Sequence, residues 1–196
     1  MKLQIKMEAL KKFPKNRKTY TVRELVTMKP SKLLALVQFD IKKIERGSKY
    51  YQVVMSQWIT VHSSSNEDSV CMVCAAGALI MLSCSTEISK ERLALGTGED
   101  IYISPAFNPI NEESSEEEID LHLQGRIMRA VNEFRAGSFR NGFYELQAAR
   151  KLIKVEALDT SNLDSIDCPF MSYSDNRSGW HIIFSKFIKD IKAIGL

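Results

Sequence analysis

The sequence lacks an apolar run of the roughly 18 to 20 residues that a membrane-crossing helix requires. Its first residues, MKLQIK, do not contain the uninterrupted apolar segment of a signal peptide. Cysteine is also scarce, because the four cysteines in 196 residues are too few for the disulfide framework of a secreted domain. We therefore expect a protein without a membrane segment, with free thiols, that stays in the cytoplasm where it is made.

The composition excludes the disordered, collagen-like and low-complexity classes, since 44% of the residues are hydrophobic and 26% are charged. A chain of this length buries a sizeable core without the help of metals or disulfides. We predict a single domain over residues 1–196. Within it, residues 1–30 form a basic N-terminal segment, 31–155 the core, and 156–196 a C-terminal extension with a terminal helix.

Charge is strongly segregated along the chain. Residues 1–49 hold 14 Lys or Arg against 4 Asp or Glu, residues 50–124 hold 2 against 12, and residues 125–196 hold 11 against 8. The basic and acidic thirds either face each other and neutralise, or they mark separate contact surfaces. For the second alternative, the partner-binding candidates are the acidic residues Glu112, Glu113, Glu116, Glu117, Glu118 and Asp120. The candidates for phosphate or nucleic-acid contact are Lys11, Lys12, Lys15, Arg17, Lys18, Arg126 and Arg129.

Apolar residues at helical spacing predict five main helices, at 32–46, 71–84, 115–137, 139–152 and 179–194. For the first of them, Ser31 is the expected N-cap and Gly47 the expected left-handed stop. Shorter signals accompany these helices. Thr21 and Glu24 have the spacing of a capping box, and residues 50–61 and 101–103 are rich enough in β-branched and aromatic residues to form strands. The fold class is therefore a mainly helical α+β domain with a minor strand element.

Two of these helices are expected to form a hairpin. Ser114 and Ser115 are each followed three residues later by a glutamate, which is the signature of a helix start. Gly137 ends the first helix, and Ser138 is expected to cap the second. Arg135 and Arg140 extend the series of hairpin arginines that begins at Arg126 and Arg129. Such a series is able to clamp a phosphate or to lie on a solvated face.

The Cys71-x-x-Cys74 pair admits three interpretations. With His62, Cys84 or His122 it has the donors of a zinc site, although a second close ligand pair is missing. As a redox pair it lacks a thioredoxin-like frame. We favour the third interpretation, in which Cys71, Cys74 and Ala78 form one face of a buried helix and Gly77 allows another backbone to approach.

Motifs for enzymatic chemistry are missing elsewhere. The sequence has no Walker loop, GxGxxG, GxSxG or HExxH motif, and we expect no cofactor. A cysteine hydrolase centred on Cys74 would need His62, His122 or His181 beside it, and nothing in the sequence selects one of the three.

Residues 33–140 resemble a group of small uncharacterised proteins of tailed bacteriophages and prophages. The resemblance is carried by Leu33-Leu34-Ala35-Leu36, Tyr50-Tyr51, Trp58, the Cys71-x-Val-Cys-x-Ala-Gly-Ala78 segment and Phe134-Arg-Ala-Gly137. It covers about half of the chain and carries no activity that can be transferred. It implies a phage accessory product that works inside a bacterium.

From these observations we predict a non-enzymatic phage protein that binds and inhibits a host defence or regulatory protein. Its contact surfaces would be the acidic segment from Glu112 to Asp120 and the basic N-terminal third, because charged patches steer association. Two alternatives remain open. One is a nucleotide-binding or nucleic-acid-binding protein that uses the basic residues, and the other is a thiol or zinc enzyme centred on Cys74.

Overall fold

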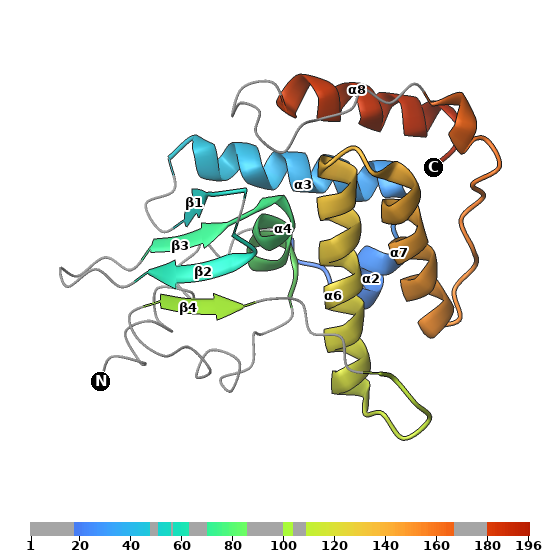
Figure 1. The fold of residues 1–196 in the computed structure, drawn as a ribbon, viewed down its shortest axis with the longest axis horizontal. Helices are drawn as coiled ribbons and strands as arrows, with labels where there is room; N and C mark the ends of the chain where they lie inside the picture. The colour runs from blue at the N-terminus through green and yellow to red at the C-terminus, as the bar shows by residue number, and fades with distance from the viewer. Residues whose placement is uncertain are drawn as a thin grey trace.

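Helices make up most of the residues that the structure describes and gather on one side of a small sheet (Figure 1). The computed structural model describes residues 18–47, 51–55, 57–62, 70–85, 100–103, 109–166 and 180–196. These residues confirm the predicted mainly helical α+β class. In chain order the described elements are α2 (Val22–Thr27), α3 (Pro30–Glu45), β1 (Tyr51–Val53), β2 (Ile59–His62), β3 (Val70–Val73), α4 (Ala75–Ser83), β4 (Asp100–Ile103), α6 (Glu116–Arg135), α7 (Phe139–Leu152), the 3-10 turn η1 (Leu163–Ser165) and α8 (Trp180–Ala193).

The sheet has four strands in the described part of the chain, in the order β1-β3-β2-β4. β3 runs parallel to β1, with Tyr51 opposite Cys71, and antiparallel to β2, with Val61 opposite the same cysteine. β2 also pairs antiparallel with β4. The expected strand region at 50–61 therefore holds two strands, which are neighbours in sequence but are separated in the sheet by β3.

The predicted helix at 71–84 is wrong in its first part. Residues Val70–Val73 form β3, and the helix α4 begins only at Ala75, with Cys74 as its N-cap. The reason is tertiary: this segment hydrogen-bonds to β1 on one side and to β2 on the other, and its two valines suit a strand. Cys71, Cys74 and Ala78 therefore do not share a helix face.

α4 lies at the centre of the molecule, between the sheet and α6 (Figure 1). It is buried along its length, and Gly77 is the point of closest approach to the sheet. A Cβ atom placed on Gly77 would lie 2.0 Å from the carbonyl oxygen of Trp58. The expectation that this glycine admits another backbone is confirmed.

The start of α3 differs from the expected one. The N-cap is Lys29, which makes no side-chain capping hydrogen bond, and Pro30 occupies the first turn, where its missing N–H group costs nothing. Ser31 is buried one residue inside the helix and does not cap it. At the other end Gly47 has the positive φ of +130° that was expected of a stop residue.

α6 and α7 form the predicted hairpin. Ser115 is the N-cap of α6, and Gly137 ends the helix with φ +80°. The amide of Ser138 donates to the carbonyl of Glu133, and the amide of Gly137 donates to that of Phe134, which is the Schellman pattern. Ser138 is the N-cap residue of α7, as expected, but its side chain makes no capping hydrogen bond.

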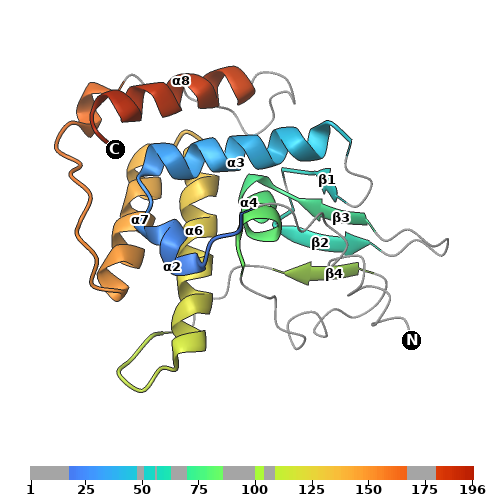
Figure 2. The same ribbon diagram turned by 180° about the vertical axis from the view of Figure 1, so that it is seen from behind.

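α8 packs antiparallel along α3, as both views show (Figures 1 and 2). Lys29 Nζ donates to the carbonyl oxygen of Gly195 at 2.9 Å, and Gln38 Nε2 donates to Ser185 Oγ at 2.6 Å. Phe187 and Ile191 of α8 are buried in the core. The expected packing of the terminal helix is confirmed. In the described ranges no helix has the length and apolar character needed to cross a membrane.

Candidate functional site

The acidic residues gather at the N-terminal end of α6, the end that points away from α3 and α8 (Figure 1). We call this surface, made of Glu112, Glu113, Glu116, Glu117, Glu118 and Asp120, the acidic tip. The five glutamates are exposed and the aspartate is half-buried. Three of them lie in the first turn of α6, where the positive end of the helix dipole stabilises negative charge.

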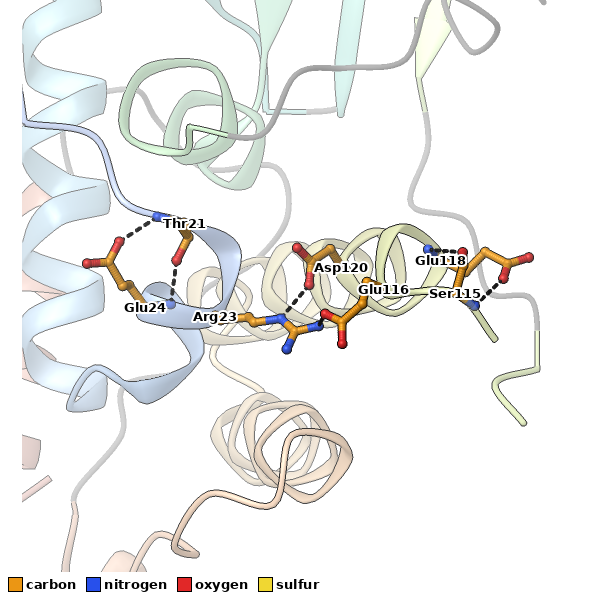
Figure 3. A network of polar contacts seen from close by, with 7 residues as sticks. All are labelled: Thr21, Arg23, Glu24, Ser115, Glu116, Glu118 and Asp120. Carbon is orange, nitrogen blue, oxygen red and sulfur yellow. Dashed lines mark hydrogen bonds and ion pairs between the residues drawn. The ribbon is translucent and has the colours of Figure 1, made fainter. Parts of the chain in front are cut away.

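One carboxylate of the acidic tip is used to start the helix. Glu118 N donates to Ser115 Oγ at 3.2 Å, and Ser115 N donates to the carboxylate of Glu118 at 2.7 Å (Figure 3). The Ser115 amide, and after it the Ser115 hydroxyl, favour the ionised carboxylate and hold the pKa of Glu118 below its ordinary value. Glu118 is therefore committed to the helix start rather than to a partner.

Two further carboxylates are bound by an arginine of α2. Arg23 Nε donates to Asp120 Oδ1 at 2.7 Å, and another nitrogen of its guanidinium pairs with Glu116 (Figure 3). The hydrogen bond to Asp120 is the main cause of a raised pKa for Arg23. Here the basic and acidic thirds of the chain do face each other. Neutralisation is thus the correct description of one part of the acidic tip.

The other three carboxylates, Glu112, Glu113 and Glu117, have no ion pair or side-chain hydrogen bond with any residue that the structure describes. The loop that carries the first two is nevertheless ordered by the side chain of Asn111. Asn111 Oδ1 accepts from Glu113 N at 3.0 Å and from the hydroxyl of Ser114 at 3.2 Å. The acidic tip therefore presents three uncommitted negative charges from a turn of fixed shape.

The basic N-terminal candidates are only partly placed. Lys11, Lys12, Lys15 and Arg17 lie outside the described residues. Lys18 is described, and its ammonium lies 4.9 Å from the centre of the Tyr20 ring in a cation–π contact.

Two of the hairpin arginines are paired with carboxylates. Arg126 donates to the carboxylate of Glu145 across the hairpin at 2.6 Å and to His122 Nε2 at 3.3 Å. Arg140 pairs with Asp164 at 2.5 Å, Arg135 donates to Asn132 Oδ1 at 3.3 Å, and Arg129 is exposed. An arginine that already holds a carboxylate has less to offer a phosphate, so the proposed clamp loses Arg126 and Arg140.

Two of the four cysteines, Cys74 and Cys84, have described side chains, and both are buried. Cys74 is buried, its Sγ accepts from Gly77 N at 3.4 Å, and burial raises the pKa of its thiol. Cys84 is also buried, whereas the side chains of His62 and Cys71 lie outside the described part, as does that of His181. His122 is buried against Arg126. Among the side chains that are described, no group of three or more His, Cys, Asp or Glu residues is placed to hold a metal.

Open hollows of about 400 and 550 Å³ lie at the two ends of α7, and an arginine that lines each of them is engaged elsewhere. In the first, Arg140 is held by Asp164. In the second, the guanidinium of Arg150 donates to the backbone carbonyls of Glu156 and Val26 at 2.6 and 3.0 Å. In each hollow the guanidinium that a small anionic ligand would use is therefore occupied.

Sequence reasoning missed Arg23, which decides how much of the acidic tip is neutralised. Arg23 lies within the basic third of the chain, which the charge distribution marks as a candidate to face the acidic third. The sequence does not reveal which of the basic residues would meet the acidic third.

The comparisons with known proteins add no relative: no family model matches the chain, and neither the curated proteins nor the solved structures yield a match.

Proposed function

We propose that this chain is a non-enzymatic binding protein that docks a positively charged partner protein on its acidic tip. The proposal is supported by the three carboxylates of the acidic tip that no described residue binds. Glu112, Glu113 and Glu117 are exposed and unused by the described residues, while their neighbours fix the backbone that carries them. A backbone that is already ordered loses little conformational freedom on binding, and exposed carboxylates steer a cationic partner toward the tip.

The phage resemblance supplies the context of the proposal. In that context the partner is a host bacterial defence or regulatory protein, and binding blocks it. A thiol enzyme centred on Cys74 receives no support from its surroundings, because the thiol is buried and its raised pKa disfavours the thiolate that a nucleophile requires.

A pull-down from bacterial lysate followed by mass spectrometry tests the proposal. We expect the immobilised protein to retain a stoichiometric basic protein at low salt and to release it as salt rises, since exposed charges are screened. The triple variant Glu112→Gln, Glu113→Gln, Glu117→Gln should lose that partner. Glu156→Gln, an exposed carboxylate at the far end of α7, is the control and should keep it.

A second control is for self-association, because another copy of the chain also carries positive charge. Sedimentation of the purified protein at low salt shows whether it forms oligomers. A monomer that captures no stoichiometric partner, or a partner that the triple variant retains unchanged, would contradict the proposal.

A further inference from the structure

The outer face of α3 carries a stripe of positive charge with an aromatic ring in it. Lys32, Ala35, Phe39, Lys42 and Arg46 follow one another at spacings of three and four residues, which places them on one side of a helix. This side faces away from the core. Phe39 is 57% exposed, which is unusual for so large an apolar side chain in a soluble domain.

α8 brings more cations to the same layer. The bonds from Lys29 to Gly195 and from Gln38 to Ser185 fix an antiparallel register in which residue numbers on the two helices add up to about 224. In this register Lys32 of α3 is level with Lys192 of α8, and Ala35 is level with Lys189. Figure 2 shows the two helices side by side over this stretch. Both lysines of α8 are exposed.

These cations are uncommitted. Within the described ranges, the side chains of Lys32, Lys42, Arg46, Lys189 and Lys192 make no ion pair. Asp190 lies on α8 between two of them but pairs with Lys186 at 3.4 Å. The hairpin arginines, by contrast, hold Glu145 and Asp164. Unpaired positive charge therefore lies on α3 and α8, whereas Arg126 and Arg140 of the hairpin are occupied by carboxylates.

We propose that the α3–α8 layer binds single-stranded nucleic acid, with the five cations on its phosphates and the Phe39 ring stacked on a base. A cationic surface with an interposed aromatic side chain is the combination by which single strands are bound without sequence preference. An anionic membrane fits less well, because the apolar residues that would enter it from α8 (Phe184, Phe187 and Ile191) are buried in the core. The layer lies at the opposite end of the molecule from the acidic tip, so this inference stands independently of the proposed function.

Fluorescence anisotropy with the full chain and a labelled 20-nucleotide single strand, DNA and RNA in turn, tests the inference. If all five cations neutralise phosphates, the logarithm of the affinity should fall against the logarithm of the salt concentration with a slope of about −3.5. Lys32→Glu with Lys189→Glu should lower the affinity at least about tenfold and flatten the slope by about 1.4. Phe39→Ala should weaken binding by about 5- to 100-fold at fixed salt and leave the slope unchanged.

The matched control is Lys151→Glu with Lys154→Glu, which changes the net charge by the same amount on exposed lysines at the end of α7. It should leave binding within about threefold of the unmodified protein. The milder pair Lys32→Gln and Lys189→Gln replaces the reversal if circular dichroism shows that the reversal unfolds the protein. The inference is overturned by any of three results. The first is no binding to the single strand, and the second is an equal loss of affinity in the control. The third is that phosphatidylserine vesicles or duplex DNA bind more tightly than the single strand while Phe39→Ala has no effect.

Discussion

Close backbone packing forms the junction between α4 and β2, whereas ion pairs form the junction between α2 and α6. At the first, the backbone of α4 touches that of β2, and Gly77 leaves no room for even one more carbon atom beside Trp58. At the second, Arg23 reaches Glu116 and Asp120, and water reaches all three side chains, with exposed fractions of 38%, 83% and 37%. The first contact depends on shape and the second on charge.

This difference separates the residues that determine the fold from those that set its surface chemistry. A buried backbone contact is not screened and cannot be relieved by a rotamer change, whereas exposed ion pairs contribute about 0 to 1 kcal/mol each. Substitutions at charged junctions should therefore alter binding and leave the fold intact. Substitutions at shape-dependent contacts should destabilise the fold. The following experiments test this separation, in order of decreasing effect.

Gly77→Ala should have the largest effect. Its new Cβ would collide with the Trp58 carbonyl oxygen, so α4 would have to move away from β2, and we expect a loss of about 3 kcal/mol or more in the free energy of unfolding. Urea denaturation measures it. Gly142→Ala is the comparison, because its Cβ would meet the ring of Phe134 at 2.6 Å, and a side chain yields more readily than backbone. Equal stability of Gly77→Ala and the unmodified protein would show that α4 is not tightly held.

Ser83→Ala tests a buried polar contact between α4 and α3. Ser83 Oγ donates to Asp40 Oδ2 at 2.5 Å, and both residues are fully buried. Removing a hydrogen bond to a buried carboxyl group costs about 1 to 3 kcal/mol, and we expect a loss in that range by thermal or urea denaturation. Ser85→Ala is the control, since Ser85 is exposed and its hydroxyl donates to the Tyr20 carbonyl. A similar loss in both variants would mean that burial is not what makes the Ser83 bond important.

Lys154→Gly should raise stability. α7 ends in a Schellman pattern in which the amides of Lys154 and Val155 donate to the carbonyls of Lys151 and Arg150. Lys154 has a φ of +54° there, a conformation that Gly137 takes at the end of α6 without strain. We expect a gain of about 0.5 to 1 kcal/mol, measured by urea denaturation. Lys151→Gly, inside the helix, is the control and should lose about 1 kcal/mol. A loss in Lys154→Gly as well would mean that the strain is not significant.

Sequence patterns predict the parts of this fold that depend on local chemistry. The capping boxes at Thr21 and Ser115 and the glycine stop at 137 are confirmed because each is decided by neighbours in the chain. The strand at Val70–Val73 was mistaken for helix because its conformation is decided by pairing with β1 and β2.

The candidate site divides in the same way. The acidic tip is visible in the sequence as a run of glutamates at a helix start, and its placement is as expected. Its partial neutralisation by Arg23 is not visible, since 93 residues separate Arg23 from Glu116. The cationic stripe of α3 is not predicted by apolar periodicity, because that periodicity identifies only the buried side of a helix.

Arg23→Ala should barely change stability but should change the acidic tip. The loss of two exposed ion pairs costs about 1 kcal/mol or less and shrinks as salt rises. The carboxylates of Glu116 and Asp120 then become available, so we expect later elution from an anion-exchange column and tighter retention of a basic partner. Lys32→Ala is the control, because it removes the same charge at the other end of the molecule. Equal elution of the two variants would mean that net charge alone, not the tip, governs the interaction.

The smallest expected effect is on the acid side of the pH–stability curve. The folded protein holds the pKa of Glu118 below its ordinary value of 4.5, so the ionised carboxylate contributes stability above that pH and loses its contribution as pH falls through the lowered value. Glu118→Gln keeps an acceptor for the Ser115 amide but does not titrate, and should therefore flatten the curve below about pH 4.5. Glu117→Gln, on the same turn but outside the capping box, is the control that removes the same charge. Parallel curves for Glu118→Gln and the unmodified protein would mean that the carboxylate of the capping box does not contribute to the dependence of stability on pH.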